Sequence, residues 1–126
     1  MIDLTELDAL SMLIAGVCHD LGHDGYTNGY HVNTISRRAI DSNDVSTQES
    51  YHASELFRIL SNDDCQFMES FSRAQYVHFR KRAISLILAT DMAHHNGKIA
   101  QMKQIIQHNE FNGDLEKIMQ WVTDGE

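Results

Sequence analysis

Residues 5–29, TELDALSMLIAGVCHDLGHDGYTNG, combine the pattern of an amphipathic helix with that of a glycine-rich loop. Thr5, followed three residues later by Asp8, resembles a capping box, so we expect a helix that begins near Asp3 or Thr5. Its apolar stripe, spaced three and four residues apart, consists of Leu7, Leu10, Ile14, Val17, Cys18 and Leu21. Loop structure should follow from Gly22 onward, because each glycine inside a helix costs about 1 kcal/mol.

Two histidines stand at the end of this predicted helix. His19 and His23 are four residues apart, so they share one face, with about 5–6 Å between their Cβ atoms, if the helix persists through both. A solvated pair is the commoner explanation of that spacing, but an aspartate, Asp20 or Asp24, follows each histidine. Imidazole and carboxylate together favour zinc, manganese, iron or magnesium. The pattern therefore indicates a metal site facing a cleft.

The remaining chain also has helical periodicity. One or two short helical turns are expected between residues 30 and 40, and Ser46–Glu49 has the S-x-x-E pattern of a capping box that opens a further helix. A third helix should begin near Ser70 or Ser72 and run to about His95. The expected inward faces of these two helices consist of Ala53, Leu56, Phe57 and Leu60, and of Tyr76, Phe79, Ala83, Leu86, Ile87 and Thr90.

Two shorter helices should complete the fold. Gly97 is expected to kink or end the third helix. The apolar faces that follow consist of Ile99, Met102, Ile105 and Ile106, and of Leu115, Ile118, Met119 and Val122. No segment has the pattern of a strand, so we expect one all-α, multi-helical domain over residues 1–126.

The composition excludes several classes of protein. The 126 residues include 18 acidic and 10 basic side chains, a formal charge of −8, which disfavours a nucleic-acid polymer or an anionic membrane surface as a partner. The longest apolar run, residues 9–18, is shorter than a membrane span, which needs about 20 residues. Cys18 and Cys65 form no disulfide framework. We therefore expect a cytoplasmic protein without membrane insertion.

Three motifs resemble one known family. His19–Tyr30, H-D-L-G-H-D-G-Y-T-N-G-Y, resembles the metal-binding signature of the class I 3′,5′-cyclic-nucleotide phosphodiesterases, which belong to the HD-domain phosphohydrolase superfamily. Ser46–His52 is similar to the family segment S-x-L-E-N-H-H, and Leu88–Met92 to its L-A-T-D-M block. The motifs occur in the family's order and span nearly the whole chain.

The resemblance implies a centre with two divalent metal ions, zinc and magnesium or manganese. His19 and Asp20 correspond to metal ligands, and Asp20 to the carboxylate that bridges both cations. The parent domain would hydrolyse cAMP or cGMP to the 5′-monophosphate in signal transduction, because two cations bridged by hydroxide supply a nucleophile and neutralise phosphoryl charge. Another HD-domain phosphohydrolase and a non-catalytic metal-binding remnant are the alternatives.

Further site residues are implied by the same resemblance, namely His23, Glu49, His52, Thr90, Asp91 and Met92. His23, Glu49 and Thr90 would hold waters bound to the metals, His52 would be another pocket histidine, and the last two would line the cleft. Local structure offers simpler explanations for some of them: Glu49 as a capping-box residue and Met92 as core filler. Asp91 within an apolar helix needs a partner or a wet cavity. Arg37–Arg38 and Arg80–Arg82 are most simply solvated helix faces.

The chain departs from the family's pattern in two ways. Ser50 and Tyr51 stand where the family has Asn-His. The family's general-acid histidine and a further metal-ligating histidine would precede the His19–Asp20 pair, and a second metal-ligating aspartate and the purine-holding glutamine and aromatic residues would follow Asp91. We therefore expect the central part of a catalytic domain, truncated at both ends and without turnover by itself.

Overall fold

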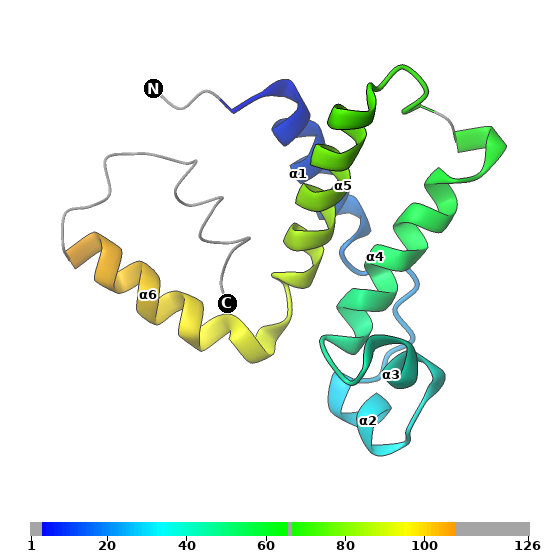
Figure 1. Ribbon diagram of the computed structural model, residues 1–126. Coiled ribbons are helices and arrows are strands. Elements are labelled where there is room, and N and C mark those ends of the chain that lie inside the picture. The colour runs from blue at the N-terminus through cyan, green and yellow to red at the C-terminus, as the bar shows by residue number, and fades with distance from the viewer. Residues whose placement is uncertain (1–3, 66, 108–126) are drawn as a thin grey trace.

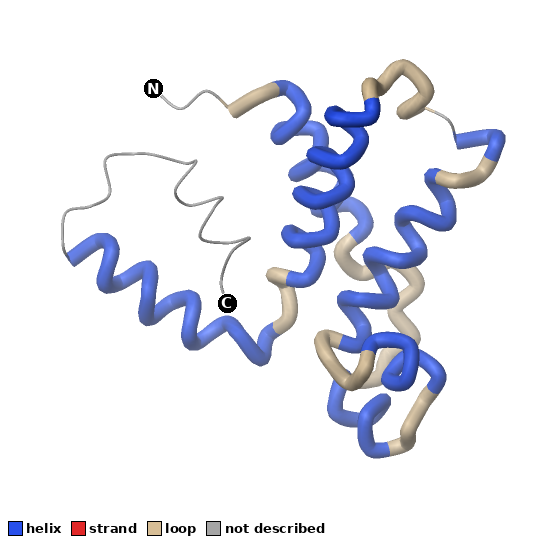
Figure 2. Tube along the Cα trace, viewed as in Figure 1, coloured by secondary structure: helices blue, strands red, loops and turns tan. Residues whose placement is uncertain are grey.

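The computed structural model describes residues 4–65 and 67–107, and every regular element within these ranges is helical (Figures 1 and 2). The elements in chain order are α1 (Glu6–Cys18), α2 (Asn28–Asn33), α3 (Arg37–Ser42), α4 (Thr47–Leu60), η1 (Asp63–Cys65), α5 (Arg73–Leu88), η2 (Met92–His94) and α6 (His95–Gln107). The predicted all-α fold is confirmed. The helix expected around Leu115–Val122 lies outside the described residues. Within the described ranges, no helix has the length and apolarity that crossing a bilayer requires.

Helices α1 and α5 lie side by side at the centre of the fold (Figure 1). Helix α4 also packs against α5, and α2 and α3 lie near the first turn of α4, while α6 points away from the α1–α5 pair. The buried apolar side chains that join α1, α4 and α5 are Ala15, Ala53, Leu56, Phe57, Phe79, Ala83 and Ile87. Most of the inward faces predicted for α4 and α5 thus belong to the core, with Leu60 and Leu86 partly buried against it. Thr90, also predicted for the α5 face, is exposed, and Tyr76 is half-buried.

Four phenylalanines close the end of the α4–α5 hairpin. The ring of Phe79, which is fully buried, has Phe57, Phe67 and Phe71 around it, with ring centroids 6.1–6.3 Å away. All three neighbours meet it edge-on, the arrangement that aromatic quadrupoles favour. The connection between the two helices is therefore held by packing of its own side chains against α5.

The predicted stripe of α1 is wrong at one position. Val17 is 82% exposed, whereas Ala15 is buried. Val17 is two residues after Ala15, which places it about 200° around the helix and so on the opposite face. The other members of the stripe, Leu7, Leu10, Ile14, Cys18 and Leu21, pack partly buried against the core.

Helix α5 ends earlier than its periodicity predicts. It begins after Ser72, one of the two expected starting points, and the Ser72 hydroxyl forms a capping box with Gln75, but the helix ends at Leu88 instead of His95. The Asp91 carboxylate accepts the backbone N–H of Ala93 and thereby opens the short helix η2. Asp91 therefore does not lie within an apolar helix. Gly97 does not end the third helix, because α5 ends before it and Gly97 lies inside α6.

The capping box predicted at Ser46–Glu49 does not form. Ser46 precedes α4 with a left-handed backbone (φ 42°), and its side chain makes no capping hydrogen bond. Its hydroxyl instead donates to Asp91, with 2.8 Å between the oxygens. The first turn of α4 is capped from another part of the chain, because Oδ1 of Asn28 accepts the N–H of Gln48 at 2.7 Å. Glu49 is thus free of the capping role.

A buried aspartate joins α1 to α5. Asp8 is only 7% exposed, and its carboxylate accepts from the Thr5 hydroxyl at 2.6 Å and faces Nε2 of His78 at 2.7 Å. The guanidinium of Arg82, predicted to be solvated, lies 3.4 Å from the same carboxylate. Burial raises the pKa of Asp8, but hydrogen bonds from Thr5 and His78 outweigh it and hold the pKa below the ordinary 3.8.

Replacement of Asp8 by Asn is expected to lower the free energy of unfolding by about 1–3 kcal/mol near neutral pH, because it removes a buried charged acceptor. The folded-state pKa lies below the unfolded value of 3.8, so the carboxylate stabilises the fold above that pH and loses its effect as the pH falls through the lower folded value. Urea unfolding at stepped pH should show the gap between wild type and D8N closing on acidification. The exposed Glu6→Gln in the same turn is the control, and a gap unchanged in strong acid would contradict the assignment.

Candidate metal centre

The loop between α1 and α2 carries the first site residues. Helix α1 ends at Cys18, so His19 and His23 do not share a helical face as the four-residue spacing had suggested. Successive turns replace the helix, with the N–H of Leu21 donating to the Cys18 carbonyl and that of His23 to the Asp20 carbonyl. The turns depend on positive φ at two glycines, Gly22 at +72° and Gly25 at +86°, which only glycine adopts without strain.

His19 and Asp20 face each other at the start of this loop. The Gly16 carbonyl can only accept, so Nδ1 of His19, 2.8 Å away, carries a proton and donates to it. The other nitrogen, Nε2, lies 3.3 Å from Oδ2 of Asp20. In the neutral ring this nitrogen has a lone pair, which leaves two electron-pair donors side by side at the surface.

A second grouping joins the loop to α4. One ligand atom each from Asp20, His23 and His52 lies within 4.8 Å of the others. The rings of His23 and His52 are stacked, with centroids 5.6 Å apart and planes inclined by 24°. His52 is buried, whereas the other two are exposed. The structure thus brings together three of the residues predicted for the site.

The two histidines of this grouping have opposite hydrogen-bonding roles. The N–H of Gly25 donates to Nδ1 of His23 at 2.9 Å, so the neutral ring of His23 carries its proton on Nε2. The Leu21 carbonyl accepts from Nδ1 of His52 at 2.7 Å, so the neutral ring of His52 has a lone pair on Nε2. His23 therefore offers a donor to the space between them, and His52 offers a ligand atom of the kind that metals take.

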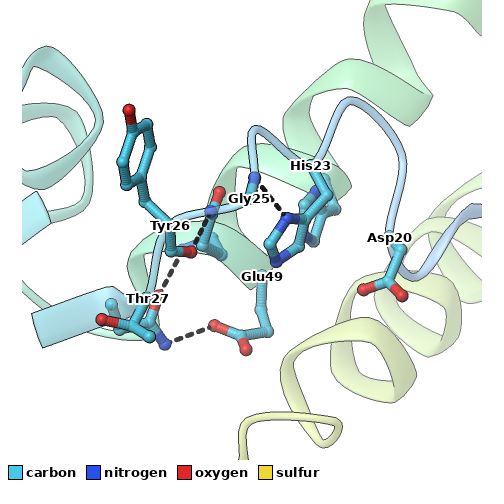
Figure 3. Close-up of a pocket in the computed structure, with 9 residues that line it drawn as sticks. Asp20, His23, Gly25, Tyr26, Thr27 and Glu49 are labelled. Carbon is cyan, nitrogen blue, oxygen red and sulfur yellow. Dashed lines mark hydrogen bonds between the residues drawn. The ribbon is translucent and has the colours of Figure 1, made fainter. Parts of the chain in front are cut away.

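This space opens into a cavity of about 220 Å³ (Figure 3). The residues that line it are Asp20, His23, Gly25, Tyr26, Thr27, Asn28, Gln48, Glu49 and His52. In the view of Figure 3 the ring of His23 lies between the carboxylates of Asp20 and Glu49. Carboxylate oxygens and imidazole nitrogens from a loop and a helix are the donor set that divalent cations of the zinc, manganese or magnesium type accept.

Asn28 is a site residue to which no role was assigned from the sequence. Its Nδ2 donates to Oε2 of Glu49 at 2.9 Å while its Oδ1 caps the first turn of α4. One amide therefore fixes both the direction of the helix and the carboxylate of Glu49. The signal was present, because Asn28 belongs to the His19–Tyr30 motif, but its partners lie 20 and 21 residues away.

Asp24 anchors the loop through a polar network that the sequence did not reveal. Its carboxylate accepts from Nε2 of Gln48 at 2.7 Å and from the N–H of Tyr26, and it pairs with His31 and Arg38 at 3.2–3.3 Å. Burial opposes ionisation, but these hydrogen bonds and the charge of Arg38 outweigh it and lower the pKa of Asp24 to about 2. Arg38, predicted to be solvated, is only 17% exposed, whereas Arg37 is exposed as expected.

The remaining predicted residues lie outside the cavity lining. Thr90 is exposed, and its hydroxyl donates to the Ile87 carbonyl. Asp91 is buried, with Ser46 and the N–H of Ala93 as its partners, and Met92 is 70% exposed. Met92 is therefore not core filler. The bond between Ser46 and Asp91 brings this segment to the start of α4, three residues before Glu49.

An all-helical fold with paired imidazole and carboxylate donors beside a cavity defines a helical domain suited to divalent cations. The family model of the 3′5′-cyclic nucleotide phosphodiesterases matches residues 3–124. The chain belongs to the 3′,5′-cyclic nucleotide phosphodiesterase family, which implies the use of divalent metal ions.

Individual relatives agree with the family assignment. The chain is 36% identical over 110 residues to the probable 3′,5′-cyclic-AMP phosphodiesterase pde-4 of Caenorhabditis elegans, covering 87% of this chain and 16% of that protein. It is 40% identical over 102 residues to the high affinity cGMP-specific 3′,5′-cyclic phosphodiesterase 9A of Drosophila melanogaster, covering 81% of this chain and 7% of that protein. The chain thus spans a small part of the length of these relatives.

A solved structure has the same arrangement of helices. The phosphodiesterase domain of the RhoPDE fusion protein from the choanoflagellate Salpingoeca rosetta superimposes with a TM-score of 0.84 at 32% identity. The match covers 95% of this chain and 39% of that domain's chain. The helical framework of the site is therefore the one found in a phosphodiesterase domain.

Replacement of Gly22 by Ala is expected to destabilise the loop by about 1–2 kcal/mol, because a side chain at positive φ is strained. The added Cβ would also lie 3.1 Å from Cε1 of Tyr51. Gly16→Ala is the matched control, since nothing lies within 4 Å of its added Cβ, and it should stabilise α1 by about 0.5–1 kcal/mol. Thermal unfolding of both variants is the measurement, and equal effects would contradict the loop geometry.

Proposed function

We propose that this chain forms part of a catalytic centre that hydrolyses the 3′,5′-cyclic nucleotides cAMP or cGMP to 5′-nucleoside monophosphates. The observation that carries the proposal is the contact between His19 and Asp20 in a chain of this family, with 3.3 Å between Nε2 and Oδ2. Two lone-pair donors at that distance repel each other unless a proton or a cation lies between them. The pair is therefore suited to bind a cation.

We propose that two divalent ions bind here, zinc and magnesium or manganese. His19 and Asp20 would be ligands, with Asp20 shared between the ions, and Nε2 of His52 offers a further lone pair near Asp20. The cations, when bound, supply an activated nucleophile at neutral pH and neutralise charge on the phosphoryl oxygens. An acidic chain needs such positive charge, because its formal charge of −8 repels a phosphodiester anion.

His23 and Glu49 are proposed to act on the phosphate and its water. The Nε2–H of His23 can donate to a phosphoryl oxygen or a water, since Nδ1 is held by Gly25. Glu49 accepts one N–H from Asn28, and a carboxylate has further acceptor sites with which to orient water. Donor and acceptor thus flank the same cavity.

Thr90, Asp91 and Met92 are proposed to contribute the wall of the site next to the start of α4. The bond from Ser46 to Asp91 supports this, because it holds the segment beside the helix that carries Glu49. Asp91 uses one oxygen for that bond and the other for η2, so it orients the segment. The exposure of Met92 suits contact with a substrate.

The cavity suits the phosphate end of the substrate. Its volume of about 220 Å³ is below the roughly 300–1,000 Å³ of a pocket that encloses a whole small molecule. Its lining is rich in carboxylate, imidazole and amide groups. The proposed substrate therefore places its cyclic phosphate here.

A cytoplasmic location and the lack of a nucleic-acid partner stay predictions from the composition.

Replacement of His19 or Asp20 by Ala is expected to weaken binding of Mn²⁺ by more than about 100-fold, beyond the 10–100-fold that loss of an outer hydrogen-bond partner costs. Isothermal titration of the purified chain gives the affinity and stoichiometry. Asp41→Ala is the control, since Asp41 is an exposed partner of Arg37. Unchanged stoichiometry and affinity in both variants would disprove the metal assignment.

Hydrolysis is best tested in a chimera in which residues 3–124 replace the matching segment of the Salpingoeca rosetta phosphodiesterase domain. In the presence of Mg²⁺ or Mn²⁺, the folded chimera should convert cAMP or cGMP to the 5′-monophosphate. The amount of product is measured by chromatography. Asp20→Asn should abolish turnover and leave the melting temperature near that of the parent chimera. A chimera that folds and binds metal but has no turnover would favour the non-catalytic alternative.

A further inference from the structure

The side chain of Arg38 contacts four partners from two parts of the site. Its Nη2 donates to the Gly22 carbonyl at 3.0 Å, and Nη1 lies 3.2 Å from the Asp24 carboxylate. On α4, Nη1 also donates to Oε1 of Gln48, and the guanidinium carbon lies 3.6 Å from the ring centroid of Tyr51. One side chain from α3 thus joins the loop to α4.

Each of these partners is next in sequence to a residue of the proposed metal centre. Gly22 and Asp24 stand on either side of His23, while Gln48 precedes Glu49 and Tyr51 precedes His52. The loop's own hydrogen bonds set its local turns but not its position relative to α4. The contacts of Arg38 therefore act on the distance and orientation between the two groups of site residues.

We infer that Arg38 is a positioning residue that holds the loop carrying Asp20 and His23 in register with the helix carrying Glu49 and His52. The inference rests on the proposed metal centre, and no contact of Arg38 with substrate or metal is involved. A guanidinium suits this role because its planar fork donates in several fixed directions and its face stacks on an aromatic ring. An ammonium has neither property, so lysine is a poor replacement even though it keeps the charge.

Other hydrogen bonds also connect the loop to α4, and they limit how much metal affinity the loss of Arg38 should cost. Nδ1 of His52 donates to the Leu21 carbonyl, Nε2 of Gln48 donates to Asp24 and to the Tyr26 carbonyl, and Asn28 caps the helix. Loss of Arg38 should therefore loosen the centre and not abolish it. Removal of a comparable outer partner from a metal site costs about 10–100-fold in metal affinity.

The test compares Arg38→Ala and Arg38→Lys with Arg37→Ala in the full chain. Arg37 is the matched control, because it precedes Arg38 on α3 but is exposed and pairs with Asp41 one turn along the same helix. The first measurement is the ¹⁵N chemical shifts of the ring nitrogens of His23 and His52 without metal, which report the tautomers. Wild type and R37A should have His23 protonated at Nε2 and His52 at Nδ1, whereas both Arg38 variants should have mixed populations.

The second measurement is Mn²⁺ affinity from electron paramagnetic resonance, well below the melting temperature. R38A should bind about tenfold more weakly than wild type, R38K should be restored only in part, and R37A should stay within about twofold. A purely structural role would lower the melting temperature and leave the tautomers and affinity of the folded protein unchanged. That result, or full rescue by lysine, would overturn the inference.

The two measurements separate this inference from the proposed function. If wild type binds no Mn²⁺, the metal assignment fails, and the tautomer populations alone decide the role of Arg38. If wild type binds Mn²⁺ and R38A matches it in affinity or tautomers, the metal assignment stands and the positioning role fails. If R38A does not fold, the tautomers and the Mn²⁺ affinity of R38K, which keeps the aliphatic stem and the charge, decide between the same two outcomes.

Discussion

The site depends on the capping of α4 by a side chain from another part of the chain. Ser46 stands at the N-cap position, but its backbone is left-handed (φ 42°) and its hydroxyl accepts no N–H of α4, so the first turn needs another acceptor. Asn28 supplies it and in the same contact holds the carboxylate of Glu49. The need to satisfy the helix terminus therefore brings the loop after α1 against α4, and the cavity forms between them.

The charges of the site are balanced by paired donors and acceptors. Asp24 lies in the same loop as Asp20, but it is neutralised by Arg38 and by hydrogen bonds, which explains its low pKa. Asp20 has a ring nitrogen of His19 as its neighbour, and Glu49 has an amide. One aspartate thus holds the loop in place, while the carboxylates toward the cavity keep the capacity to bind a cation or water.

Local patterns in the sequence were sufficient to predict most of the helices but not the contacts between them. Most of the inward faces of α4 and α5 follow from apolar spacing, and the capping box at Thr5 follows from Asp8 three positions later. The capping box at Ser46 failed because Ser46 has a left-handed backbone and its hydroxyl faces Asp91, which is 45 residues away. The end of α5 was missed because periodicity continues through residues 89–95, while the Asp91 side chain starts a new helix. No sequence periodicity reports on such distant partners.

Some site residues could be identified from sequence motifs, whereas others are recognised only by their contacts in the folded structure. The His19–Tyr30 motif identified Asp20 and His23, and the segment around Glu49 identified Glu49 and His52, all four of which line the cavity. Arg38 and Gln48 were not identified, because an arginine beside another arginine on a short helix is indistinguishable from a solvated one until its partners are known. The 17% exposure of Arg38 against 86% for Arg37 comes entirely from tertiary structure.

The departure from the family's pattern at Ser50 and Tyr51 has a structural explanation. The hydroxyl of Ser50 donates to the Val45 carbonyl, which turns it back to the segment before α4. The edge of the Tyr51 ring lies next to Gly22, and the Arg38 guanidinium stacks on the face of the same ring. A larger side chain than glycine at position 22 would displace this ring, and a smaller one than tyrosine at position 51 would leave the guanidinium without a surface to stack on. Glycine, tyrosine and arginine therefore form one packed unit, and the position of His23 relative to His52 depends on all three.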